Sequence, residues 1–128
     1  MADIVRLMQT MPDLYTMKGV SEEEIQNAEQ ELGLKFATDY RKYVSAFGAI
    51  SFESHELTGV CSSKRLSVVD VTIKERRNCD VPEDWYVIEQ ANIDGIVIWQ
   101  DASGSVYQTG PGAKQKRLCK SLAAYIEL

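Results

Sequence analysis

The stretch GVSEEEIQNAEQELGLKFATDYRKYVSAFGAISFESHELTGV, residues 19–60, carries the clearest structural signals in the chain. Ser21 and Glu24 match a capping box, in which the serine side chain accepts a hydrogen bond from the Glu24 backbone and the glutamate reaches back. Apolar residues then recur at helical spacing: Ile25, Ala28 and Leu32. Because Gly33 can adopt the left-handed conformation that ends helices, we predict a helix between Ser21 and Gly33.

A second helix is predicted from Thr38 to Phe47, with Gly48 ending it. Its apolar face consists of residues at helical spacing: Tyr40, Tyr43, Val44 and Phe47. Residues 49–60 alternate as a strand does. Upstream of this region, we predict a short helix over residues 2–9 and a loop over residues 11–19.

The second half of the chain reads mainly as strands and turns. Residues 66–78 contain β-branched residues that favour a strand, but their apolar positions have helical spacing, so we predict a helix. Turns are expected at Asp94-Gly95 and at Gly104. The predicted strands are 86–91, 96–101 and 105–109. The remaining predictions are a loop over 80–85, a loop over 110–116 and a closing helix over 117–128.

This order of elements predicts an α+β fold, in which an antiparallel sheet is flanked by helices. Strands joined by tight turns pair in antiparallel fashion, and helices grouped outside such a sheet define the α+β class. The 128 residues fit one domain. Residues 1–19 are expected to form a helix and loop leading into it.

The overall composition excludes several classes of protein. A net charge of −5 and a pI of about 4.9 argue against nucleic-acid binding and fit either a basic partner or simple solubility. The three cysteines include no C-x-x-C pair, so neither a zinc site nor a redox motif is predicted. We find no signal-peptide pattern and no apolar run of about 18 residues, so we expect a cytoplasmic protein without a membrane span.

The sequence contains weak candidates for chemistry and no recognised motif. His55 is the single histidine, and in a strand it would share a face with Glu53, which permits a histidine–carboxylate pair. No nucleophile signature surrounds Cys61, and His55 with Glu53 and Glu56 lacks a metal-ligand spacing. The segment TGPGAKQK lacks the context of a phosphate-binding loop. We therefore predict no catalytic residues, no metal and no cofactor.

Negative charge is concentrated in two segments. Residues 20–60 contain eight acids and three bases, and residues 86–110 contain three acids and no base. Residues 111–128 contain four bases and one acid, while the other segments are balanced. An acidic region followed by a basic C-terminal segment makes electrostatic recognition a candidate function.

The ordered pattern of residues resembles the SUKH superfamily, the Smi/Knr-type domain. The first half of the pattern consists of Ser21, Ile25, Glu29, Leu32, Gly33, Leu34, Asp39, Tyr40, Phe47, Gly48, Leu57 and Gly59. The second half consists of Val87, Ile88, Gly95, Ile98, Asp101, Gly104 and Tyr107. Two positions depart from the usual pattern, since Ala37 stands where proline is common and Ala49 where a second glycine is common. The resemblance covers residues 20–128.

The resemblance implies a non-enzymatic binding domain. Bacterial members are similar to immunity proteins that bind and neutralise a cognate toxin domain, whereas fungal members resemble regulators of cell-wall synthesis. A compact single chain is more similar to the bacterial kind. The partner would then be a protein toxin, and a nuclease toxin would be basic because it must hold phosphate.

We therefore expect an acidic face that meets a basic toxin surface. Its predicted contributors are acids and aromatic anchors: Glu53, Glu56, Asp94, Trp99, Asp101 and Tyr107. The competing interpretation places Trp99 and Tyr107 in the core and makes the helix glutamates a solvated face. Two other functions remain open: a regulatory adaptor that docks on a host protein, and a small enzyme that uses His55.

Overall fold

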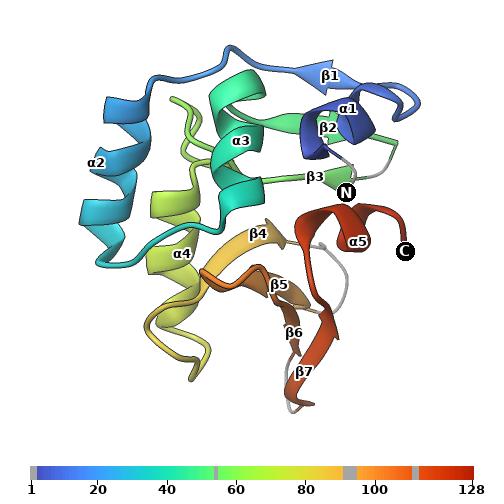
Figure 1. Ribbon diagram of the computed structural model, residues 1–128. Coiled ribbons are helices and arrows are strands. Elements are labelled where there is room, and N and C mark those ends of the chain that lie inside the picture. The colour runs from blue at the N-terminus through green and yellow to red at the C-terminus, as the bar shows by residue number, and fades with distance from the viewer. Residues whose placement is uncertain (1–2, 54, 91–94, 111–112) are drawn as a thin grey trace.

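The computed structural model describes residues 3–53, 55–90, 95–110 and 113–128 (Figure 1). The helices are α1 Ile4–Gln9, α2 Glu22–Leu32, α3 Thr38–Phe47, α4 Val68–Arg76 and α5 Leu122–Ile126. The strands are β1 Tyr15–Thr16, β2 Ile50–Phe52, β3 His55–Glu56, β4 Tyr86–Gln90, β5 Val97–Gln100, β6 Val106–Gly110 and β7 Ala113–Cys119.

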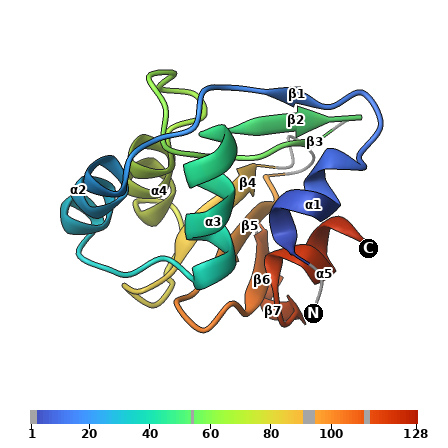
Figure 2. The same cartoon turned by 45° about the horizontal axis from the view of Figure 1, so that its top comes forward.

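The strands form two antiparallel sheets where the sequence predicted one. The first sheet has the order β1-β2-β3, and the second has the order β4-β5-β6-β7. An isolated antiparallel bridge between Leu57 and Glu89 connects the end of β3 to β4. Helix α3 contacts α1, α2 and α5, while α2 and α4 lie side by side at one end of the molecule (Figure 2). The predicted α+β class is therefore confirmed.

The helices of the first half form where their local signals place them. The Ser21 side chain accepts a hydrogen bond from the Glu24 backbone at 3.2 Å, and Gly33 adopts a φ of 68° at the end of α2. Helix α4 begins after Ser67, whose side chain accepts from the Asp70 backbone at 3.4 Å. The choice of a helix for residues 66–78 is thus confirmed.

The region 49–60 is a hairpin and not a single strand. Strand β2 ends at Phe52, and Glu53 occupies a turn with a φ of 50° before β3 begins at His55. Alternation of residue types could not reveal this reversal, because a turn residue interrupts it without glycine or proline. Strand β1, Tyr15–Thr16, pairs with β2 inside the segment predicted as a loop.

The predictions of a loop over 110–116 and a helix over 117–128 are wrong in part. Strand β7 occupies Ala113–Cys119 and pairs with β6, and the helix begins only after Ser121. The lysines and arginine of this segment suit an exposed edge strand, which proteins often protect with charge. Leu118 lies at helical spacing from Leu122, and this coincidence extended the predicted helix too far.

The core is organised around three fully buried tyrosines whose hydroxyls are hydrogen-bonded. The Tyr40 hydroxyl lies 2.9 Å from the Thr58 hydroxyl, and the Tyr43 hydroxyl donates to the Thr58 carbonyl at 2.7 Å. The Tyr86 hydroxyl donates to the Gln100 side chain at 2.7 Å. These bonds satisfy the polar groups that burial removes from water. Burial also raises the pKa of all three tyrosines, so they stay neutral.

Ala37, one of the two departures from the family pattern, has a structural explanation. Its φ of −64° is the value that proline imposes. Its backbone N–H, which proline lacks, donates to the Tyr86 hydroxyl at 2.9 Å. The alanine therefore keeps the proline-like entry into α3 and adds a buried hydrogen bond to β4.

Candidate partner-binding surfaces

The residues predicted for the binding face do not lie together. Glu53 and Glu56 belong to the β2–β3 hairpin, whereas Asp101 follows β5 and Tyr107 lies on β6. Figures 1 and 2 both show the hairpin turn far from the turn between β5 and β6. Asp94 lies outside the described residues. The structure thus divides the predicted face into two separate surfaces.

Trp99 is a core residue and not a surface anchor. Its side chain is fully buried, and its Nε1 atom donates to the Thr109 hydroxyl at 2.9 Å. It packs with Trp85, Val87 and other apolar residues in a small second core cluster. All four residues of β5 are buried, so the side chains on both faces of this strand are covered.

Tyr107 and Asp101 are hydrogen-bonded to each other at the turn between β5 and β6. The Tyr107 ring stacks on Trp85 with 3.9 Å between centroids, and its hydroxyl donates to Asp101 Oδ2 at 2.8 Å. Asp101 Oδ1 also accepts from the Ser103 and Ser105 backbones at 3.0 and 3.2 Å. Burial raises the pKa of the Asp101 carboxyl, but the hydrogen bonds outweigh it and hold the pKa below its ordinary value. Both side chains are therefore committed to internal contacts.

The β2–β3 hairpin presents one unpaired and one paired carboxylate. Glu53 is exposed in the turn, and no ion pair of the described residues involves it. Glu56 accepts from both terminal nitrogens of Arg65, at 2.7 and 2.9 Å. The hydrogen bonds from Arg65 lower the pKa of the Glu56 carboxyl. Charge at Glu56 is thus largely neutralised within the molecule.

His55 pairs with a carboxylate that sequence reasoning missed. Its Nδ1 atom lies 3.0 Å from Glu89 Oε2, and the Tyr125 hydroxyl also donates to Glu89. Glu53 is not its partner, because the turn separates the two residues. Glu89 is buried, and the signal that could have found it was an acid inside an otherwise uncharged strand. The three side chains join β3, β4 and α5, which makes the group a structural contact.

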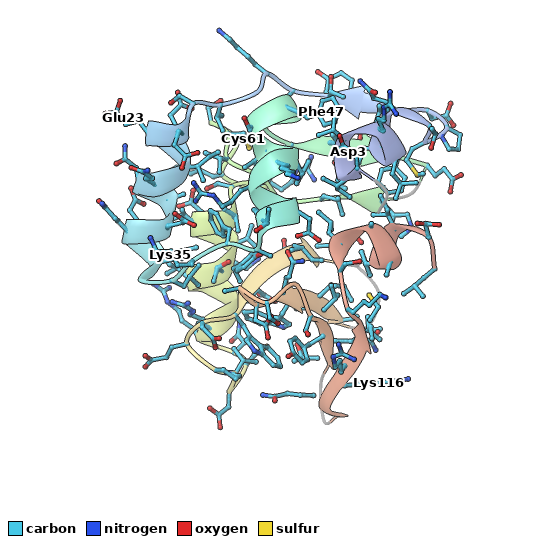
Figure 3. All side chains as sticks on the ribbon, viewed as in Figure 1. Asp3, Glu23, Lys35, Phe47, Cys61 and Lys116 are labelled. Atoms are coloured by element: carbon cyan, nitrogen blue, oxygen red, sulfur yellow. The ribbon has the colours of Figure 1, made fainter. Side chains whose placement is uncertain are left out.

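A groove of about 550 Å³ opens between α2, α4 and the loop after β3. Its floor is formed by small and apolar residues, including Ala28, Val60 and Val68. Its acidic lining residues are Glu24, Glu31 and Asp70, and its one basic lining residue is Lys18. Cys61 also lines it, and Figure 3 shows Glu23 on the outer side of α2, away from Cys61.

The sequence assigned the helix glutamates to a solvated face, and Glu24 and Glu31 are exposed, but their position beside a groove was not predicted. Glu24 and Glu31 are separated by two helical turns, so they share one side of α2 with Asn27 and Ala28. That spacing was visible in the sequence. The sequence could not show which element packs beside this face, because α4 comes from residues far along the chain.

The described residues define a small α+β chain with an acidic groove. They contain no group of three histidine, cysteine or acidic side chains placed to hold a metal ion. Among these same residues, no helix combines the length and apolar character that crossing a membrane requires.

A family model described as "SUKH_5: SMI1-KNR4 cell-wall" matches residues 1–127. The chain therefore belongs to this SMI1-KNR4 family, and the resemblance found in the sequence is confirmed. A comparison with curated proteins finds no significant match.

Two acids of the family pattern hold the scaffold together. Glu29 is buried, accepts from the Phe36 backbone at 2.9 Å and lies 2.7 Å from Arg41. Asp39 accepts from the Leu122 backbone at 2.8 Å and from the Gln100 side chain at 3.2 Å. These contacts join α2 to α3, and α3 to α5 and β5. The pattern thus identifies the fold more than it identifies a binding surface.

Proposed function

We propose that this chain is a non-enzymatic immunity protein that acts in the cytoplasm by binding and neutralising a cognate bacterial toxin domain. The observation that carries the proposal is membership of the SMI1-KNR4 family over residues 1–127. The net charge of −5 supports a partner with a basic surface. Nuclease toxins fit this description because they must hold phosphate.

The arrangement of the titratable residues supports binding without catalysis. His55 contacts the buried carboxylate of Glu89, which also accepts from the Tyr125 hydroxyl, and Cys61 lines a different part of the molecule. A nucleophilic enzyme needs its nucleophile and base within hydrogen-bond reach. No described contact joins His55 to a serine, threonine or cysteine side chain.

The direct test is coexpression with the toxic domain encoded beside the gene. We expect the wild-type chain to restore growth of cells that express this domain, and to leave cells expressing an unrelated toxin domain unprotected. A His55→Ala variant should protect equally well if no chemistry is involved. Failure to protect against the neighbouring domain, with both proteins expressed and folded, would exclude the immunity function.

A regulatory adaptor is the second candidate function, and the family description favours it by naming the cell wall. In this alternative the chain docks on a protein of its own cell and alters that partner's activity. A gene neighbourhood without a toxin, together with a change in cell-wall composition on deletion of the gene, would support the adaptor. An adaptor would leave cells that express the toxin domain unprotected, whereas an immunity protein would let them survive.

A further inference from the structure

We propose that the groove between α2 and α4 is the docking site for a lysine- or arginine-bearing segment of the partner protein. This inference rests on the proposed function, in which that partner is the toxin domain. It is carried by the shape of the groove, by its apolar floor and by the charge around it.

The groove suits an extended side chain with a charged end. Its volume of about 550 Å³ lies within the range of about 300–1,000 Å³ typical of ligand sites. Val20, Val60 and Val69 are partly buried against the main core and line the groove. Lysine and arginine bury their aliphatic stems along such a surface while their charged ends stay at the rim.

The charge around the groove selects a basic occupant. Glu24, Glu31 and Asp70 line the groove together with one basic residue, Lys18, so the lining carries an excess of two negative charges. Within the described residues, no ion pair involves any of the three carboxylates. They contrast with Glu29 and Glu56, which are paired with arginines of the same chain. Unpaired carboxylates beside an apolar floor complement a cationic and apolar segment.

The basic residues at the β7 end of the chain lie on the side of the molecule away from the groove, and this separation of charge favours a partner whose basic segment points toward the groove. Lys116, Arg117 and Lys120 belong to the β7 end of the chain, which lies across the molecule from α2 in Figures 1 and 2. The molecule is therefore acidic at the groove and basic at β7. Such a charge asymmetry directs a basic segment toward the groove, and it also allows the basic strand of a second copy as a competing occupant.

Matched charge reversals test the groove directly. Glu23 and Glu24 are adjacent exposed residues in the first turn of α2, but Glu24 lines the groove and Glu23 does not. We expect Glu24→Lys and Glu31→Lys each to weaken toxin-domain binding at least about tenfold, and Glu23→Lys to weaken it less than about threefold. Glu23→Lys and Glu24→Lys both place a positive charge in the first turn of α2, where the helix dipole disfavours it, so thermal melts of each variant, run beside the binding assay, separate a loss of stability from a loss of binding.

A second readout uses the cysteines of the wild-type chain. Cys61 lines the groove, whereas Cys79 and Cys119 lie elsewhere, and all three are free and partly exposed. Bound partner should slow alkylation of Cys61 at least about fivefold and leave Cys79 and Cys119 as internal references. The probes are the toxin domain and, separately, a short synthetic peptide of alternating lysine and leucine.

The results of these two experiments distinguish an error in the groove assignment from an error in the proposed immunity function. If the toxin domain binds but Cys61 stays reactive and Glu24→Lys behaves as Glu23→Lys does, the groove inference is wrong and immunity stands. If the toxin domain neither binds nor is neutralised, while the peptide protects Cys61 and Glu24→Lys abolishes that protection, the groove stands and immunity fails. If the toxin domain is not neutralised and neither probe protects Cys61, both the immunity function and the groove assignment are wrong. Self-association through the groove, seen as a salt-sensitive dimer that Glu24→Lys dissociates, would also overturn the docking assignment.

Discussion

Gly59 approaches the backbone of Gly48 so closely that a side chain does not fit between them. A Cβ atom on Gly59 would lie 1.7 Å from the Gly48 carbonyl oxygen. We expect Gly59→Ala to lower the free energy of unfolding by about 3 kcal/mol or more, because backbone atoms on both sides must move. Urea denaturation of the variant measures the loss.

Gly110→Ala is the matched control for Gly59→Ala. A Cβ atom there would lie 3.7 Å from Ile96 Cγ1, which is an ordinary contact. The control should change the free energy of unfolding by less than about 1 kcal/mol. Equal stabilities for the two variants would show that the segments around Gly48 and Gly59 do not pack as described.

Asp101 gives the turn between β5 and β6 a defined dependence on pH. Because its pKa is lowered in the folded state, its contribution is complete above the pKa of unfolded aspartate, near 3.8, and is lost as the pH falls through the lower folded value. We expect Asp101→Asn to cost less than about 1 kcal/mol at neutral pH, since Asp101 is only partly buried and water still screens its charge. The difference in unfolding free energy between wild type and variant should stay constant from pH 7 to about pH 4 and shrink at lower pH. A difference that does not shrink below about pH 4 would contradict this.

At the scale of elements, helix α5 depends on a carboxylate from α3. Asp39 accepts from the backbone of Leu122, the first residue of α5, and also holds Gln100 of β5. We expect Asp39→Ala to lower the free energy of unfolding by about 2 kcal/mol, the upper range for loss of a helix cap. Compared with the wild type, amide hydrogen exchange of the variant should accelerate more in α5 than in α4. Equal acceleration in both helices, or none in either, would contradict a local role of Asp39.

The elements that could be predicted from the sequence are those with local signals. Helices α2 and α3 follow from the capping residue Ser21, from periodic apolar residues and from the glycines that end them. Strand β7 could not be predicted, because its pairing with β6 depends on tertiary contact and its residues carry a helix-like spacing. The hairpin at Glu53 was missed for a different reason, because no glycine or proline marks the turn.

The sequence predicted the negative charge of the groove but not the residues that come together there. The sequence showed an excess of acid in residues 20–60, and the groove lies partly in that segment. It could not show that Trp99 is buried, that Glu89 pairs with His55, or that α4 covers one side of α2. Each of these facts depends on residues distant in sequence.

At the scale of the whole molecule, Glu53 should act on a partner from a distance. Helices α2 and α4, which line the groove, lie at the end of the molecule opposite to the β2–β3 turn in Figures 1 and 2. We expect Glu53→Lys to slow association with the toxin domain about two- to threefold at low salt and to leave dissociation nearly unchanged. Surface plasmon resonance at low and high salt measures both rates. A tenfold faster dissociation would instead place the hairpin inside the interface.

Isothermal titration calorimetry of the two purified proteins tests most directly whether this acidic chain binds a toxin domain tightly. We predict a 1:1 complex with a dissociation constant in the nanomolar range, about −12 kcal/mol, that weakens as salt increases. Absence of binding heat at two temperatures, with both proteins folded, would contradict the claim and leave the adaptor as the remaining function.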